Sequence, residues 1–426
     1  MRSGENSLKY GFYLTYSDLE NDFDELAELT DKGLEVLHVS LPLPRVEEYY
    51  TDTRIKPHHV KRSLIIKLRE LVRDAQSIGL KVVPPLKVFH FSQLDENIDL
   101  ASVTVFNKRN REWACPVNNE VRHRVEADMR NLIETYDVDG ILLDFLRYGG
   151  VFYGLENYLV CFCEECCRDA KERGFNLYLI KSDLIELYEK VVSVDVDILV
   201  NFPQLTSLFE WVYTTIDYHS LTDWLALHRE IISEYTYYLT KLAKSLGGPS
   251  LAVGATLMAP MWSILVGQDY RDFSIIVDFI EPLLYFDQII WEGLPVVKEI
   301  SDKSGINKDL LTKIYFRLLG LDSKYTKPYN VLKEEGLDIE ALSEIAEACI
   351  ELNVENKPLY AAISCSKKCF ENKYSKEIFS NIKVLSEDLV VETVEKISVL
   401  SPDLIIFNAY RESKEFLFKY FKYIAV

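Results

Sequence analysis

A short apolar run interrupted by one carboxylate, residues 137–148 (DVDGILLDFLRY), most constrains the fold of this chain. Side chains alternate along a strand, so Leu142 and Asp144 share one face, while the other face is apolar throughout. A strand that is apolar on both faces is typical of a parallel sheet covered by helices. The run therefore predicts an α/β protein in which Asp144 ends a strand, where such folds place their chemistry. The alternative is a buried acid that only accepts an ion pair from Arg147.

The remaining chain alternates segments of strand and helix character. Strands are predicted at 9–16, 34–41, 80–89, 140–145, 251–258, 279–286, 358–364 and 404–410. Helical periodicity fills the intervals, as in 60–78 and 118–136, and predicts a last helix at 412–423.

Eight alternating units without a Gly/Ser/Pro-rich linker predict one (β/α)₈ TIM-barrel domain over residues 1–426. Residues 149–220 form a long insertion after the fourth strand, which we expect to be a lid or subdomain. The alternative, an open doubly wound sheet, would need a Gly-rich phosphate turn after the first strand, and residues 14–19 contain none.

Composition limits the partners. The chain has 426 residues, 48% of them hydrophobic, so it can form a large core, and its formal charge is −19. That charge argues against nucleic acid or an anionic membrane as a partner and suits a neutral or cationic substrate. The sequence shows no apolar run of membrane-spanning length and no apolar segment of signal-peptide type at its start, which predicts a cytoplasmic protein. Nothing in the sequence specifies an oligomeric state.

Three carboxylates are candidates for catalysis. Asp144 beside Arg147 suits an ionised role, because a nearby cation favours the charged form of an acid. Asp269 follows the fifth strand, and Glu281 lies within the sixth. If Glu281 faces the barrel interior, burial would favour its protonated form, as a general acid requires; its alternative is a buried, ion-paired Glu. Two such carboxylates flanking a bond can hydrolyse a glycoside.

Other polar and aromatic residues follow the carboxyl ends of the predicted strands. We expect Arg147 and Tyr148 to orient Asp144, and aromatic rings to stack on sugar rings. The predicted substrate-binding residues are Arg147, Tyr148, His90, Trp262, Tyr285, Trp291 and Asn408. Aromatic residues of this kind are also common as plain packing.

Half of the eight cysteines crowd into residues 161–167 (CFCEECC). Thiolates at this spacing are ligands for structural zinc, so Cys161, Cys163, Cys166 and Cys167 are candidate metal ligands. Cys115 could supply a distant ligand, and the alternative is a helix start with buried thiols. No other cofactor is expected.

Two stretches resemble uncharacterised glycoside hydrolase-like TIM-barrel families. They are WACPVN at 113–118 and YDVDGILLDFLRY at 136–148, with weaker similarity in the cysteine stretch and in 267–285. The resemblance implies a barrel related to amylase-like and other retaining glycosidases, with Asp144 as nucleophile. A chitinase-like DxxDxDxE pattern also overlaps this strand, but Leu142 and Leu146 replace two of its acids, which argues against chitinase chemistry.

Two functions remain open from the sequence. The first is hydrolysis of an oligo- or polysaccharide, with Asp144 as nucleophile or base and a second carboxylate, Asp269 or Glu281, as acid. The second is a non-catalytic carbohydrate-binding or scaffold barrel, because no Glu in the usual acid position follows the fourth or fifth strand.

Overall fold

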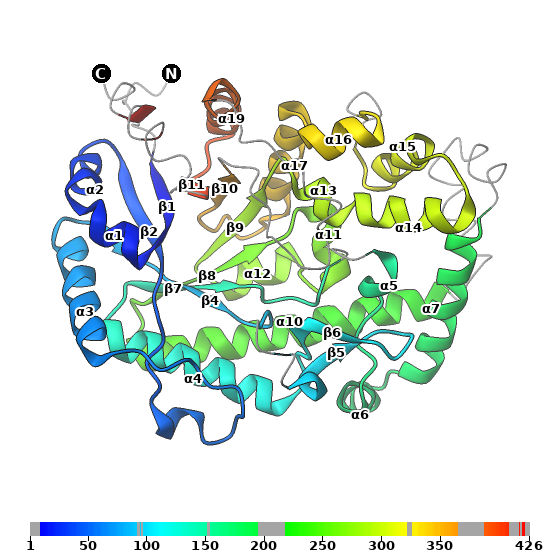
Figure 1. Cartoon of the computed structure of the whole chain (residues 1–426), viewed down its shortest axis with the longest axis horizontal. Helices are drawn as coiled ribbons and strands as arrows, with labels where there is room; N and C mark the ends of the chain where they lie inside the picture. The colour runs from blue at the N-terminus through cyan, green and yellow to red at the C-terminus, as the bar shows by residue number, and fades with distance from the viewer. Residues whose placement is uncertain are drawn as a thin grey trace.

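The computed structural model describes residues 9–91, 94, 97–150, 154–194, 218–321, 326–364, 387–408, 417 and 420–421. Within these residues a single curved parallel sheet forms the centre of the molecule (Figure 1). Its strands run in the order β3-β2-β1-β11-β10-β9-β8-β7-β4, and each pairs with its neighbour in parallel. The strands are β1 (Tyr10–Thr15), β2 (Leu34–Ser40), β3 (Lys81–Val82), β4 (Pro85–Lys87), β7 (Gly140–Asp144), β8 (Ala252–Leu257), β9 (Phe279–Leu284), β10 (Tyr360–Ser364) and β11 (Leu404–Asn408).

The two ends of this sheet are pieces of one strand. β3 and β4 are separated only by Val83 and Pro84, and the two pieces pair on opposite sides, with β2 and β7 respectively. A proline has no N–H to donate to a strand ladder, so the Pro84–Pro85 pair explains the interruption. Counted this way, the described residues contain eight barrel strands, and the predicted TIM barrel is confirmed.

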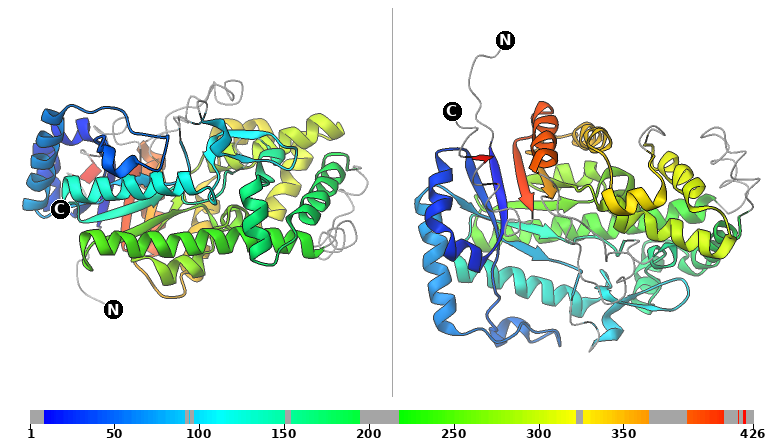
Figure 2. Two further views of the ribbon diagram at one scale, coloured as in Figure 1. Left: turned by 90° about the horizontal axis from the view of Figure 1, so that it is seen from below. Right: turned by 45° about the horizontal axis from the view of Figure 1, so that its top comes forward.

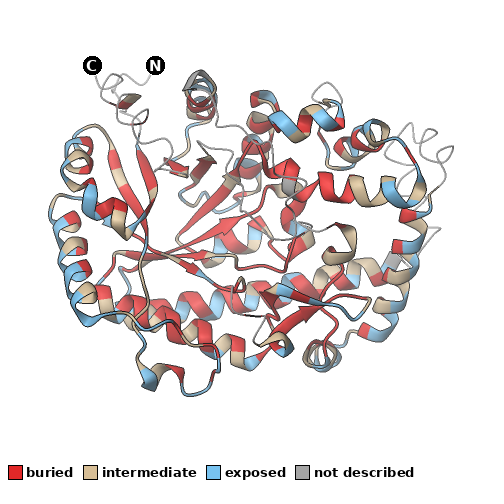
Figure 3. Ribbon diagram, in the orientation of Figure 1, coloured by how far each residue is buried: buried red, intermediate tan, exposed pale blue. Residues whose placement is uncertain are grey.

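Helices cover the outer face of the barrel, and their inward sides are buried while their outward sides are exposed (Figure 3). They begin and end as follows: α1 (Tyr16–Asn21), α2 (Phe23–Thr30), α3 (Arg62–Ser77), α4 (Asn119–Tyr136), α10 (Tyr218–Gly247), α11 (Pro260–Ser263), α12 (Tyr270–Ile276), α13 (Gln288–Glu292), α14 (Leu294–Ser304), α15 (Lys308–Leu318), α16 (Tyr329–Glu335), α17 (Ile339–Leu352) and α19 (Glu387–Val399). The helix predicted at 412–423 falls almost entirely outside the described residues.

The insertion after β7 lies to one side of the barrel (Figures 1 and 2). Its described part contains α5 (Leu155–Tyr158), α6 (Glu164–Glu172), α7 (Leu177–Val192) and the start of α10. Next to it lies an antiparallel hairpin, β5 (Ala101–Val103) and β6 (Arg109–Ala114), which the sequence did not predict. α14, from the segment after β9, packs against α5 and α7, so two loops at the carboxyl end of the sheet build this side together.

The barrel interior is layered. Its lower layer is apolar and is formed by inward-facing side chains of successive strands: Val36, Val83, Leu142, Phe279, Ala362 and Ile406. Because inward positions recur every second residue, the next layer toward the carboxyl ends must come from residues two positions further on. Among the described residues, no helix combines the length and the apolar character needed to cross a membrane.

Candidate functional site

The second interior layer is polar. It contains Tyr13, His38, Asp144, Thr256 and Glu281. Each of them lies two residues beyond an inward-facing position of the lower layer, which is an apolar residue or, in β1 and β8, a glycine. The register confirms this placement, since Thr256 lies opposite Glu281 in the paired strands β8 and β9. A polar layer at the carboxyl end of a barrel is where TIM-barrel proteins place their sites.

Asp144 is partly buried at the end of β7. Its Oδ1 accepts a hydrogen bond of 2.8 Å from the Thr256 hydroxyl and one of 3.0 Å from the Phe145 N–H. Burial raises the pKa of Asp144, although the Thr256 hydrogen bond and the charges of Lys87 and Arg147 oppose this shift. The charge of Arg147 therefore does act to lower the pKa of Asp144, as expected from the sequence, but burial raises that pKa by more.

The residue after Asp144 has an unusual backbone. Phe145 adopts φ = 54°, in the left-handed region that side chains other than glycine rarely enter. Such a conformation costs on the order of 1–3 kcal/mol and occurs preferentially at functional sites. It places the Phe145 ring 4.8 Å from the His90 ring and 5.7 Å from the Trp113 ring, measured between centroids.

Glu281 is completely buried and does face the barrel interior. Its Oε1 accepts a 2.5 Å hydrogen bond from the Tyr13 hydroxyl, and its Oε2 lies 2.9 Å from His38 Nε2. The other ring nitrogen of His38 lies 2.7 Å from the Val83 carbonyl. Burial lowers the pKa of His38, but the charge and hydrogen bond of Glu281 outweigh it, so the net shift is upward. The Glu281 carboxylate also acts electrostatically on Asp144.

Two basic residues lie beside Asp144. Lys87 is its register partner on β4 and is exposed, and Lys87 Nζ lies 5.9 Å from the centre of the Phe145 ring. His90 follows three residues later. Burial and the charges of Lys87 and Arg147 lower the pKa of His90 to about 4, so its imidazole is neutral at neutral pH.

Arg147 is buried against an aromatic wall rather than reaching into solvent. Its guanidinium carbon lies 4.5 Å from the centre of the Trp113 ring. Burial lowers the pKa of Arg147, and the charges of Glu292 and Asp144 oppose this. Glu292 is buried at the end of α13. Tyr148 is also buried, stacked 3.7 Å from His228 of α10.

Tyr285 and Asn408 come together at the mouth of the barrel. The Asn408 side-chain amide donates a 2.9 Å hydrogen bond to the Tyr285 hydroxyl, joining the ends of β9 and β11. Burial raises the pKa of Tyr285, and the charges of Glu281 and Asp144 add to the effect. These two predicted residues therefore belong to the same cluster as Asp144.

Other predicted residues lie apart from this cluster. Asp269 is the N-cap of α12, where it accepts from the Arg271 N–H, and its Oδ2 lies 3.1 Å from Arg229 Nε. Trp262 is fully buried and its indole N–H donates to Tyr315. Trp291 lies in α13, and its side chain is outside the described part of the structure.

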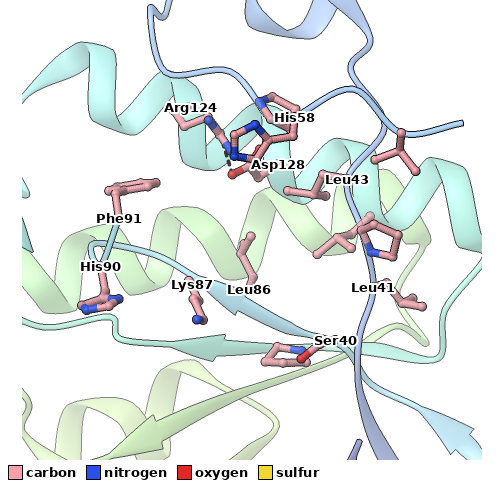
Figure 4. A pocket seen from close by; sticks show the side chains of 15 residues that line it. Ser40, Leu41, Leu43, His58, Leu86, Lys87, His90, Phe91, Arg124 and Asp128 are labelled. Atoms are coloured by element: carbon pink, nitrogen blue, oxygen red, sulfur yellow. Dashed lines mark hydrogen bonds and ion pairs between the residues drawn. The ribbon is translucent and has the colours of Figure 1, made fainter. Parts of the chain in front are cut away.

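A cavity of about 460 Å³ lies beside β4. It is lined by residues of β2, β4, α4 and the loop after β2 (Figure 4). Leu86 extends toward α4, whereas Lys87 extends to the other side of the strand. Arg124 and Asp128 in its wall are paired at 2.7 Å. Lys87 and His90, which lie beside Asp144, are among its lining residues, so this cavity borders the polar layer.

The structure brings four of the cysteines together: Cys115, Cys161, Cys163 and Cys166, whose sulfur atoms all lie within 4.8 Å of one another. Cys167, one of the expected ligands, is not in this group, and Cys115 from the end of β6 takes its place. All four members are buried, whereas Cys167 is only partly buried.

Four residues of the site were missed by the sequence reasoning: Tyr13, His38, Lys87 and Thr256. Each lies inside a predicted strand at an inward position, whereas most of the predicted site residues follow the ends of their strands. The signal was available, since a polar side chain two residues after an inward apolar one is expected in the upper layer of a barrel.

The fold is a (β/α)₈ barrel whose polar layer lies toward the carboxyl ends of its strands. The glycoside hydrolase domain of PgaB (BpsB) from Bordetella bronchiseptica superposes with a TM-score of 0.52 at 10% identity, covering 94% of this chain and 93% of that one. A β-galactosidase from the Antarctic haloarchaeon Halorubrum lacusprofundi gives a TM-score of 0.53 at 11% identity, covering 94% of this chain and 52% of that one. At these identities the likeness shows the fold alone. No family model and no curated protein matches the sequence.

Proposed function

We propose that this protein is a glycoside hydrolase acting on an oligo- or polysaccharide, with Asp144 as nucleophile or base. The observation that carries the proposal is the placement of Asp144. It ends the fourth barrel strand, is partly buried and is held by Thr256, and it is followed by the strained backbone of Phe145. A fixed carboxylate in a desolvated site suits attack on an anomeric carbon or activation of water.

Glu281 is the second carboxylate that this geometry supports. The charge of Glu281 acts on Asp144 and helps to raise its pKa. Asp269, the other candidate, instead caps α12 and pairs with Arg229. Glu281 is fully buried, so the Tyr13 hydroxyl would donate its own proton to the leaving group, and the proton shared by His38 and Glu281 would then pass through Glu281 to the Tyr13 oxygen. The Tyr13 hydroxyl is bonded to Glu281 and its side chain is partly exposed. Lys87 and the Tyr285–Asn408 pair would bind sugar hydroxyls at the mouth.

The test is a digestion screen of polysaccharides, oligosaccharides and aryl glycosides with the wild type, Asp144→Asn and the control Asp269→Asn. We expect Asp144→Asn to lose about 10²-fold or more of the rate, and Asp269→Asn to keep most of it. Azide restoring activity to Asp144→Ala, with a glycosyl azide as product, would show that Asp144 is the nucleophile or the base, and a wild-type product of retained rather than inverted configuration would identify it as nucleophile. Full activity in Asp144→Asn on a glycan that the wild type cleaves would refute the proposal.

Tyr13 can be tested separately through the leaving group. Tyr13→Phe removes only the hydroxyl, so aryl glycosides with acidic leaving groups should still react while natural glycans react slowly. Tyr10→Phe on the same strand is the matched control, because the Tyr10 hydroxyl is buried and has no hydrogen-bond partner among the described residues. Equal losses on both substrate types would exclude proton delivery by Tyr13.

A second function is favoured by one observation. Glu281 has no exposed surface, so the acid of a conventional carboxylate pair does not face the mouth. A barrel that binds glycans without cleaving them fits that arrangement. Glycan binding by the wild type and by Asp144→Asn with equal affinity, together with no cleavage in the screen, would favour this second function.

A further inference from the structure

We propose that Cys115, Cys161, Cys163 and Cys166 hold one zinc ion that fastens the insertion to the barrel. The four thiols come from distant parts of the chain, Cys115 from the end of β6 and the others from the start of the insertion. Convergence of this kind needs a cause, because buried thiols alone contribute no directional attraction that would gather four of them at one point.

The spacing of the sulfur atoms fits a tetrahedral ion. Cys115 Sγ lies 3.5 Å from Cys163 Sγ and 3.3 Å from Cys166 Sγ, and Cys161 Sγ lies 3.9 Å from Cys163 Sγ. Four sulfurs at about 2.3 Å from a central zinc are separated by roughly 3.8 Å at their tetrahedral edges. The six described cysteines that include these four are all free, so no disulfide accounts for the grouping.

The surroundings suit thiolate ligands. Cys163 is the N-cap of α6, and its sulfur lies 3.4 Å from the Cys166 N–H, so the positive end of the helix faces it. Cys161 Sγ lies 3.5 Å from the Val103 N–H of β5. Backbone N–H groups that bond ligand sulfurs orient them and stabilise their negative charge, as outer-shell partners do in metal sites. All four ligands are protein side chains, which is the pattern of a structural rather than a catalytic zinc.

The four thiols lie where the insertion meets the β5–β6 hairpin, so a metal bound there would link the two. Residues 159–162 run beside the β5–β6 hairpin, where Val105 donates to the Leu159 carbonyl and Phe162 donates to the Val103 carbonyl. The Val160 carbonyl, one residue before Cys161, accepts from the Trp224 indole of α10. A metal here would hold the hairpin, the insertion and α10 together. Trp113, the aromatic partner of Arg147, lies on the same hairpin strand as the Cys115 attachment.

The experiment is elemental analysis of the full-length protein, purified without added metal in a buffer free of chelators. We expect about one zinc per chain. A mercurial that modifies the thiols should release this zinc in proportion to the thiols modified, and a colorimetric zinc indicator measures the release. Cobalt exchanged into the site should show the intense visible absorption of tetrahedral cobalt with thiolate ligands. Cys115→Ser and Cys163→Ser should retain less than about a tenth of the zinc.

Cys167→Ser is the matched control, because Cys167 adjoins the cluster in sequence but does not belong to it, and it should keep its full zinc content. Wild-type protein with less than roughly a tenth of an equivalent of zinc and freely titrating thiols would overturn the proposal. So would a loss of zinc in Cys167→Ser as large as that in Cys115→Ser. The wild-type measurement decides even if the serine variants fail to fold.

Discussion

The buried pair between Glu281 and His38 makes a quantitative prediction about stability. Glu281→Gln keeps the size of the side chain but removes its charge. The His38 Nε2 contact at 2.9 Å and the Tyr13 hydrogen bond at 2.5 Å then lose their charged partner, although His38 remains fully buried. Breaking one side of a buried ion pair costs about 3–5 kcal/mol, so we expect a loss of about 3 kcal/mol in the free energy of unfolding, since glutamine keeps part of the hydrogen bonding.

The sign of the pH dependence follows from His38. Its folded-state pKa is raised by Glu281, against the opposing effect of burial, so the folded protein holds this proton more tightly than the unfolded chain does. This contribution to stability is fully present below the unfolded pKa of about 6.5 and is lost as pH rises through the folded value. The wild type should therefore lose stability above about pH 6.5, and Glu281→Gln should lose less over the same range.

Urea denaturation at several pH values between about 5.5 and 9, followed by fluorescence and circular dichroism, measures both effects. The control is Glu35→Gln, which breaks the largely exposed pair with Lys9 and should cost less than about 1 kcal/mol at every pH. A loss below about 1 kcal/mol in Glu281→Gln, or a pH dependence identical to that of the wild type, would refute the reasoning.

Two further predictions concern the same site, and a third concerns Asp269, which lies apart from it. Asp144→Asn should raise the free energy of unfolding at neutral pH, because burial penalises the ionised carboxylate; a destabilised variant in thermal denaturation would contradict this. His90, with a pKa of about 4, should show no imidazole titration by NMR between about pH 5.5 and 8, and a midpoint near 6.5 would disprove its burial beside Lys87 and Arg147. Asp269→Ala should cost about 1 kcal/mol through the lost cap of α12 while leaving glycan binding unchanged, and a loss of binding would return Asp269 to the site.

The sequence predicted the barrel because its signals are local. The strands carry apolar runs of the right length, and helices such as α3 and α4 show a clear period. The β5–β6 hairpin was missed because residues 109–114 (RNREWA) read as polar loop, and the hairpin is stabilised by the insertion beside it rather than by its own pattern. Likewise, the residues around Cys115 and Cys167 in the sequence do not indicate which of the two is the fourth member of the cysteine cluster.

The candidate site was predicted in part for the same reason. Asp144 is recognisable because it interrupts an apolar run, but the partners of Glu281 depend on which strands become neighbours across the barrel. Tyr13 and His38 are separated from Glu281 by more than 240 residues of sequence, so only the closed barrel brings them together. Asp269 was chosen by its position after a strand, and its capping role depends on the exact start of α12.

The length of α10 has a mechanical consequence. Its 30 residues span roughly 45 Å. Trp224 near its start lies beside the insertion, and Lys244 near its end binds Asp278 before β9. Along this length it packs against α4, α7 and α12, so it contacts both the barrel and the insertion. A hinge motion between the barrel and the insertion would have to bend α10 or break its packing against the neighbouring helices. We therefore expect the insertion to tumble with the barrel as one body, with any gating of the mouth confined to shorter loops around it.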